Sequence, residues 1–246
     1  MKANKMIIPS LFTLGNFLFG FISIIRTSQG EYRSAAWYII LAVLCDGLDG
    51  RIARLYQRET VFGLELDSLG DLISSGIAPA FLLYSSVLVP LHYVAILLAF
   101  FFIMAGGYRL ARYNWLNRKK RMEDYLGLPL PVAALSVSGL LLFEIRLGYA
   151  FLISGWVLWV LFLSMLMISV IPYNWPRMDF RKSVGSRIVA MAIFVLFPVL
   201  IIFPEWVLFP IFFVYISAGA LRWILSFENE TIRVRDLFWH DDYNGV

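Results

Sequence analysis

The chain has 246 residues, of which 60% are hydrophobic, 17% aromatic and only 15% charged, and its mean hydropathy is +0.75. A soluble domain carries about a quarter of its residues as charges, so this composition excludes both an ordinary soluble protein and a disordered one. Long continuous apolar runs favour membrane-spanning helices over a membrane barrel, whose strands alternate apolar and polar residues. A basic cytoplasmic face is normal in membrane proteins and suits anionic lipids. It explains the net charge of +4, so we expect no nucleic acid partner.

The apolar stretches predict an all-α, polytopic membrane bundle of about eight transmembrane helices. In chain order these cover residues 7–25, 35–55, 66–89, 91–111, 130–143, 150–171, 188–203 and 206–225. The first stretch is too long for the core of a signal peptide and lacks a cleavage pattern, so we interpret it as a retained helix. We expect a single domain over 1–246, with the bundle in 1–227 and a polar cytoplasmic tail in 228–246.

The distribution of Lys and Arg predicts the orientation of this bundle. If the N-terminus is cytoplasmic, 18 of the 21 basic residues fall on the cytoplasmic side, and only Arg26, Arg33 and Arg146 fall outside. Basic residues accumulate on the cytoplasmic side of membrane proteins. The asymmetry therefore supports an even number of helices, with both termini in the cytoplasm.

The residue inventory restricts the chemistry that the chain can perform. Its single cysteine, Cys45, excludes a disulfide framework and a multi-thiolate metal site. Its two histidines, His92 and His240, are too far apart in sequence to form a local ligand pair. We therefore expect the chemistry to depend on carboxylates, hydroxyls and basic side chains.

Four aspartates interrupt the second and third apolar segments: Asp46, Asp49, Asp67 and Asp71. A charge inside a membrane costs at least a few kcal/mol, so four together require compensation. Spacings of three and four residues place each pair on one helix face, and two facing helices would gather all four carboxylates. Hard oxygen ligands of this kind suit Mg²⁺, Mn²⁺ or Ca²⁺, and a two-metal site typically serves phosphoryl chemistry.

The neighbours of the aspartates fit a nucleotide ligand. Gly47, Gly50 and Ala53 keep the second helix thin enough for a bulky ligand to approach, and Arg54 supplies a cation for a phosphate. Small residues also permit close packing of membrane helices, and that alternative explains the glycines equally well. It does not explain the aspartates. An ion-coupled transporter would also contain buried carboxylates, but it would spread them along a pathway and show repeated halves.

The spacing from Asp46 to Asp71 follows the pattern D-x2-D-G-x2-A-R-x8-G-x3-D-x3-D, with all eight fixed positions filled. This pattern resembles the signature of the CDP-alcohol phosphatidyltransferase family. The resemblance implies an eight-helix arrangement built on a six-helix core, a homodimer in the cytoplasmic membrane and an active site facing the cytoplasm. It also implies two divalent metal ions, Mn²⁺ or Mg²⁺, with Ca²⁺ as a possible bound substitute.

The resemblance also implies roles for individual residues. The metal ligands would be Asp46, Asp49, Asp67 and Asp71, and Asp71 would also be the general base. Contacts to the CDP-lipid would come from Gly50, Ala53, Arg54, Thr60 and Gly63. The family often opens its first helix with Pro-Asn-x-x-Thr near the nucleotide, and here Ser10 replaces the Asn while Thr13 is retained.

Further motifs, in residues 8–16, 65–71, 76–80, 109–114 and 127–134, resemble the branch of the family whose acceptor is serine. They imply transfer of a phosphatidyl group from CDP-diacylglycerol to L-serine, giving phosphatidylserine and CMP. Arg112, Arg109 and Asn114 are candidates for binding the serine, although both arginines would also serve as anchors for lipid phosphates. Glycerol 3-phosphate or inositol as the acceptor, and an ether lipid as the donor, are the alternatives within the family.

Overall fold

The computed structural model describes residues 4–56, 61–119, 126–148, 151–171, 173 and 203–225. The elements in these ranges are helices, which confirms the all-α prediction. The α-helices are α1 (Asn4–Ser28), α2 (Tyr32–Tyr56), α3 (Val61–Asp71), α4 (Ala78–Leu83), α5 (Tyr93–Lys119), α6 (Leu130–Leu147), α7 (Ile153–Ile168) and α9 (Pro204–Leu225). Between α3 and α5 lie two π-helical segments, η1 (Leu72–Ile77) and η2 (Tyr84–Leu88), and a 3₁₀ turn, η3 (Val89–Leu91).

Five helical segments within the described ranges are long and apolar enough to cross a membrane. They cover Leu11–Ser28, Gly63–Leu91, Tyr93–Leu116, Leu130–Leu147 and Pro204–Leu221. The helix α2 is less apolar because it contains the charges around Asp46, and α7 is apolar but only 16 residues long. The chain thus has the helices of a membrane protein, while the total of eight spans and the orientation stay predictions. The predicted span 188–203 and the tail 228–246 lie outside the described residues.

The third predicted span, residues 66–89, is a continuous but irregular helix over residues 61–91. Its first π-helical segment, η1, directly precedes Pro79, which lies in the first turn of α4. Proline has no N–H to donate to the carbonyl of Ser75, four residues earlier, and its ring would clash with that carbonyl. The wider turn of a π-helix accommodates this defect. Pro90, after η2, has the same relation to Ser86.

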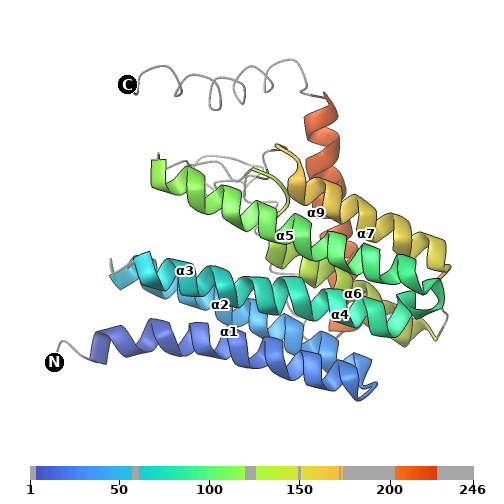
Figure 1. Cartoon of the computed structure of the whole chain (residues 1–246), viewed down its shortest axis with the longest axis horizontal. Coiled ribbons are helices and arrows are strands. Elements are labelled where there is room, and N and C mark those ends of the chain that lie inside the picture. The colour runs from blue at the N-terminus through green and yellow to red at the C-terminus, as the bar shows by residue number, and fades with distance from the viewer. Residues whose placement is uncertain are drawn as a thin grey trace.

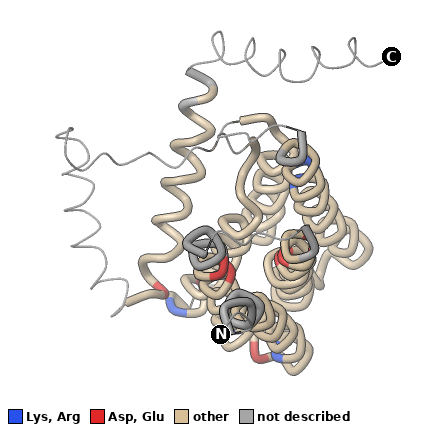
Figure 2. The backbone as a smooth tube through the Cα atoms, turned by 90° about the vertical axis from the view of Figure 1, so that its left-hand side faces the viewer, with Lys and Arg blue, Asp and Glu red and all other residues tan. Residues whose placement is uncertain are grey.

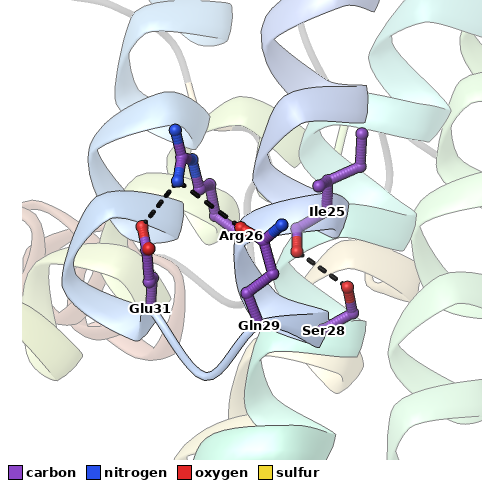
Figure 3. A network of polar contacts seen from close by, with 5 residues as sticks. All are labelled: Ile25, Arg26, Ser28, Gln29 and Glu31. Carbon is purple, nitrogen blue, oxygen red and sulfur yellow. Dashed lines mark hydrogen bonds and ion pairs between the residues drawn. The ribbon is translucent and has the colours of Figure 1, made fainter.

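A tight turn joins α1 to α2 (Figure 3). Gly30 adopts a φ of 78°, in the left-handed region that glycine occupies without strain. Arg26 Nη1 donates to Glu31 Oε2 over 2.9 Å and to Gln29 Oε1 over 3.4 Å, while Ser28 Oγ donates to the carbonyl of Ile25. These side chains are exposed, so the ion pair contributes under about 1 kcal/mol. The turn is set by the backbone, and it returns α2 alongside α1.

The helices pack so that α1 lies along α2, α5 lies against α7, and α6 lies against both α2 and α9. Figure 1 shows α9 crossing the other helices at a steep angle. The crossing of α6 and α9 is close at Gly139, where a Cβ atom would lie 3.1 Å from the backbone nitrogen of Phe209. The buried core includes Phe102, Leu130 and Trp156, from α5, α6 and α7. This packing leaves α1, α2 and α3 to enclose the aspartates.

Candidate active site

Three of the four predicted aspartates converge in the structure. Asp46 on α2 and Asp67 and Asp71 on α3 each offer a carboxylate oxygen, and these three atoms lie within 4.8 Å of one another. Figure 2, which views the bundle from the end at which α1 begins, shows acidic positions among the closely packed helices. The predicted juxtaposition of two aspartate-bearing helices is therefore present, and it brings like charges together inside an apolar bundle.

Asp49 lies beside this group and has a partner of its own. It interacts electrostatically with Asp46 and Asp67, and its Oδ2 accepts a hydrogen bond from the Thr13 hydroxyl of α1. The Asp49 side chain is only 6% exposed, and among the residues that the structure describes its other oxygen, Oδ1, has no hydrogen-bond partner. A buried carboxylate oxygen without a donor is costly, so this atom points to a ligand.

Asn16, also on α1, contacts Asp71. Its Nδ2 donates to Asp71 Oδ1 over 3.2 Å, and the Asn16 side chain is fully buried. The close approach of α1 depends on Gly70, where a Cβ atom would lie 2.9 Å from the ring of Phe17 and 3.3 Å from Asn16 Nδ2. Thr13 and Asn16 are three residues apart and share one helix face. One face of α1 thus holds carboxylates from both α2 and α3.

The donor set fits divalent cations. Carboxylate oxygens are the ligands that Mg²⁺ and Mn²⁺ prefer, and three of them are near enough to one another to share an ion. Two further observations agree with bound cations: the like charges need compensation, and Asp49 Oδ1 is buried with no donor in the described part of the chain. The residues that would hold the ions are Asp46, Asp49, Asp67 and Asp71.

The predicted acceptor residue Asn114 lies at the edge of this site. Its Nδ2 donates to the hydroxyl of Ser68 over 3.0 Å, and that hydroxyl donates in turn to the carbonyl of Leu64. Ser68 follows Asp67 directly in α3, so the contact joins the far end of α5 to the aspartate-bearing helix. The predicted role of Asn114 in binding serine stays a prediction.

Arg112, the second acceptor candidate, binds backbone carbonyls. Its Nη1 donates to Ile168 over 2.8 Å, and its Nη2 donates to Leu126, Met167 and Ser169 over 3.1, 3.3 and 2.7 Å. Three of these carbonyls belong to the C-terminal end of α7, where a cation is favoured by the helix dipole. The guanidinium therefore fastens α5 to the end of α7, and its predicted contact with an acceptor stays a prediction.

Arg109, the third acceptor candidate, lies one helical turn before Arg112 in α5 and is 6% exposed. It interacts electrostatically with Tyr215 of α9. The structure places it inside the bundle, away from the surface position of a lipid anchor.

The predicted CDP-lipid contacts are described only in part. Thr13 is in the site, bound to Asp49, and Gly63 lies one turn before Asp67 in α3. Thr60 lies outside the described residues, as do the side chains at positions 10, 50, 53 and 54. Their roles stay predictions.

Sequence reasoning missed Asn16 and Ser68 as site residues. Both lie within the quoted motifs, and Asn16 follows Thr13 at a spacing that puts the two on one face. That spacing is a signal that would have found Asn16. Ser68 carries no comparable signal, because its partner Asn114 comes from a helix 46 residues later.

Comparison with known proteins agrees with the geometry of the site. The model of the CDP-alcohol phosphatidyltransferase family matches residues 6–160. A CDP-diacylglycerol–serine O-phosphatidyltransferase of Helicobacter pylori is 28% identical over 229 residues, covering 91% of this chain and 94% of the relative. The protein of that name from Mycobacterium leprae is 38% identical over 69% of this chain and 58% of its own length. An archaetidylserine synthase of Methanothermobacter thermautotrophicus is 38% identical, covering 70% of each chain. The chain therefore belongs to the CDP-alcohol phosphatidyltransferase family.

Proposed function

We propose that this protein transfers the phosphatidyl group of CDP-diacylglycerol to the hydroxyl of L-serine, giving phosphatidylserine and CMP. The observation that carries the proposal is the convergence of Asp46, Asp67 and Asp71 within the family's motif. Serine is supported as the acceptor because the relatives' names differ in the lipid and agree in serine. The name of the archaetidylserine synthase is the reason to test an ether-linked donor as well.

Different side chains bind the metal ions, accept the proton and position the carboxylates. The aspartates would hold two divalent cations, Mg²⁺ or Mn²⁺, which offset negative charge on the phosphate oxygens. Asp71 accepts the proton of the serine hydroxyl as that oxygen forms a bond to the phosphorus, and the bond from phosphorus to the CMP oxygen breaks. Asn16 fixes the carboxylate of Asp71, and Thr13 fixes that of Asp49. Positioning contributes much of the rate, because a carboxylate among cations is a weak base.

We also propose that the protein is a homodimer in the cytoplasmic membrane, with the site facing the cytoplasm. The family resemblance supports the dimer. The excess of Lys and Arg on one side of the predicted membrane spans supports the orientation. Cross-linking in native membranes tests the dimer. Reaction of substituted cysteines at positions 29 and 118 with a membrane-impermeant thiol reagent tests the orientation.

The central experiment measures CMP release by the purified protein with CDP-diacylglycerol and each candidate alcohol, in Mg²⁺ or Mn²⁺. We expect release that depends on serine, stops on addition of a chelator and returns when the metal is restored. Release with glycerol 3-phosphate or inositol and none with serine would refute the acceptor. A parallel assay with an ether-linked CDP-lipid tests the donor.

A further inference from the structure

Of the two arms of the Asn16 side-chain amide, only the nitrogen has a hydrogen-bond partner among the described residues. Its Nδ2 donates to Asp71 Oδ1 over 3.2 Å, whereas its Oδ1 is buried and has no hydrogen-bond partner within the described ranges. A carboxylate only accepts hydrogen bonds, so the nitrogen of the amide must face Asp71, and the oxygen on the other arm must point elsewhere. Buried amide oxygens are almost always paired. The described residues supply no donor to this oxygen, so a bound ligand is a candidate for that role.

A second buried polar group lies where α1 packs against η1. One turn after Asn16, α1 crosses η1 at Gly20, where a Cβ atom would lie 2.8 Å from Cα and Cβ of Ser74. The Ser74 hydroxyl is also fully buried, and no described residue forms a hydrogen bond with it. Asn16 Oδ1 and the Ser74 hydroxyl are thus two buried polar atoms, on the two elements that flank Asp71, with no hydrogen-bond partner among the described residues.

We propose that the Asn16 side-chain oxygen accepts a hydrogen bond from the ammonium group of the acceptor, and so selects amino alcohols such as serine. The inference rests on the proposed function. In serine the hydroxyl and the ammonium lie on adjacent carbon atoms, and in Asn16 the amide nitrogen and oxygen lie on one carbon. An acceptor whose hydroxyl reaches Asp71, within about 3 Å, therefore brings its ammonium next to the amide oxygen.

A metal ion is the competing occupant, since amide oxygens also bind hard cations. The geometry favours the ammonium. Asp46, Asp67 and Asp71 already supply the clustered carboxylate oxygens for a cation. The bond from Asn16 Nδ2 to Asp71 turns the amide oxygen away from the carboxylate oxygen that it contacts.

The test compares serine with 3-hydroxypropionate, which is serine without its ammonium group. For the wild-type protein, we expect kcat/KM to be roughly ten- to a hundredfold higher for serine, the range for a hydrogen bond to a charged group. In Asn16→Leu and in the smaller Asn16→Ala, this ratio should fall toward one, mainly through KM for serine. Loss of the bond to Asp71 should lower kcat for both acceptors alike. Binding of radiolabelled serine in the presence of CMP and Mn²⁺ should weaken by the same factor, without any turnover.

Thr27→Val is the matched control. Thr27 is also buried on α1, and its hydroxyl has no partner among the described residues, but it is 11 residues, about three turns, from Asn16. This variant should keep the wild-type ratio. An unchanged ratio in both Asn16 variants, or a wild-type protein that treats the two acceptors alike, would overturn the inference. So would an unchanged ratio accompanied by a higher half-saturating Mn²⁺ concentration, which would make the amide a metal ligand. Absence of serine-dependent CMP release in the wild type would instead refute the proposed function.

Discussion

Asn16 and Asp71 are 55 residues apart in the chain and are joined by a 3.2 Å hydrogen bond between side chains. On the same face of α1, the hydroxyl of Thr13 binds Asp49. The first helix therefore holds one carboxylate from α2 and one from α3. Substitutions along this face and at the carboxylates should separate the proton-transfer step from the binding of metal.

Replacing Asp71 by Asn should abolish proton transfer, because an amide cannot take the hydroxyl proton of the acceptor. We expect kcat to fall at least about a hundredfold. Binding of CDP-diacylglycerol, measured by displacement of a labelled CDP-lipid at saturating metal, should stay measurable. Retained turnover in this variant would remove Asp71 from the role of base.

Replacing Thr13 by Val should weaken metal binding, because it removes the hydroxyl that orients Asp49. Loss of such an outer hydrogen bond typically costs 10- to 100-fold in metal affinity. The measurement is the Mn²⁺ concentration that gives half-maximal CMP release, with kcat at saturating Mn²⁺ much less affected.

Ser23→Ala is the control for this substitution. Ser23 lies on the same helix, is fully buried, and donates over 2.9 Å to the carbonyl of Ala35. It should lower stability slightly and leave the Mn²⁺ requirement unchanged. An equal shift in both variants would show that α1 acts only through overall stability.

Replacing Gly20 by Ala should destabilise the bundle, because the new Cβ would lie 2.8 Å from backbone and side-chain atoms of Ser74. Separation of α1 from η1 should cost about 1–3 kcal/mol. Thermal unfolding in detergent measures this cost. Gly155→Ala on α7, where a Cβ meets nothing within 4 Å, should instead be neutral or stabilising by up to about 1 kcal/mol. Similar unfolding temperatures in the two variants would contradict the close crossing.

Replacing Arg112 by Lys should destabilise the junction of α5 and α7. Four carbonyls, at Leu126 and residues 167–169, accept from its guanidinium. A single ammonium cannot reach all of them, so a loss of about 1.5–3 kcal/mol is expected. Thermal unfolding and KM for serine are measured together. A normal unfolding temperature with a raised KM would assign Arg112 to the acceptor after all.

The features that the sequence predicts well are those governed by composition and helix periodicity. Apolar runs locate α1, α2, α5, α6, α7 and α9 to within several residues. Spacings of three and four residues predict that the aspartates share faces, and the structure brings Asp46, Asp67 and Asp71 together. The hydrogen bonding of these segments is internal to each helix, so local sequence suffices to predict them.

The features that the sequence does not predict depend on contacts between distant elements. The π-helical turn of η1 follows from a proline in the next helix, and the apolar run that predicts the span does not indicate this turn. Arg112 is a typical cytoplasmic anchor by sequence, yet its partners are backbone carbonyls up to 57 residues away. Every residue type has a backbone carbonyl, so the sequence does not indicate which carbonyls Arg112 will contact. Such a contact is recognised only once the helices are positioned in three dimensions.

The elements that form the site, α1, α2 and α3, are the first to be synthesised. Thr13, Asn16 and the four aspartates all lie within the first 71 residues. Membrane proteins are synthesised from the N-terminus, and early segments can associate before later ones emerge. The aspartate carboxylates can therefore meet the polar face of α1 while the ribosome is still translating α5. Thr13 and Asn16 thus offer hydrogen bonds to Asp49 and Asp71 before the later helices are made.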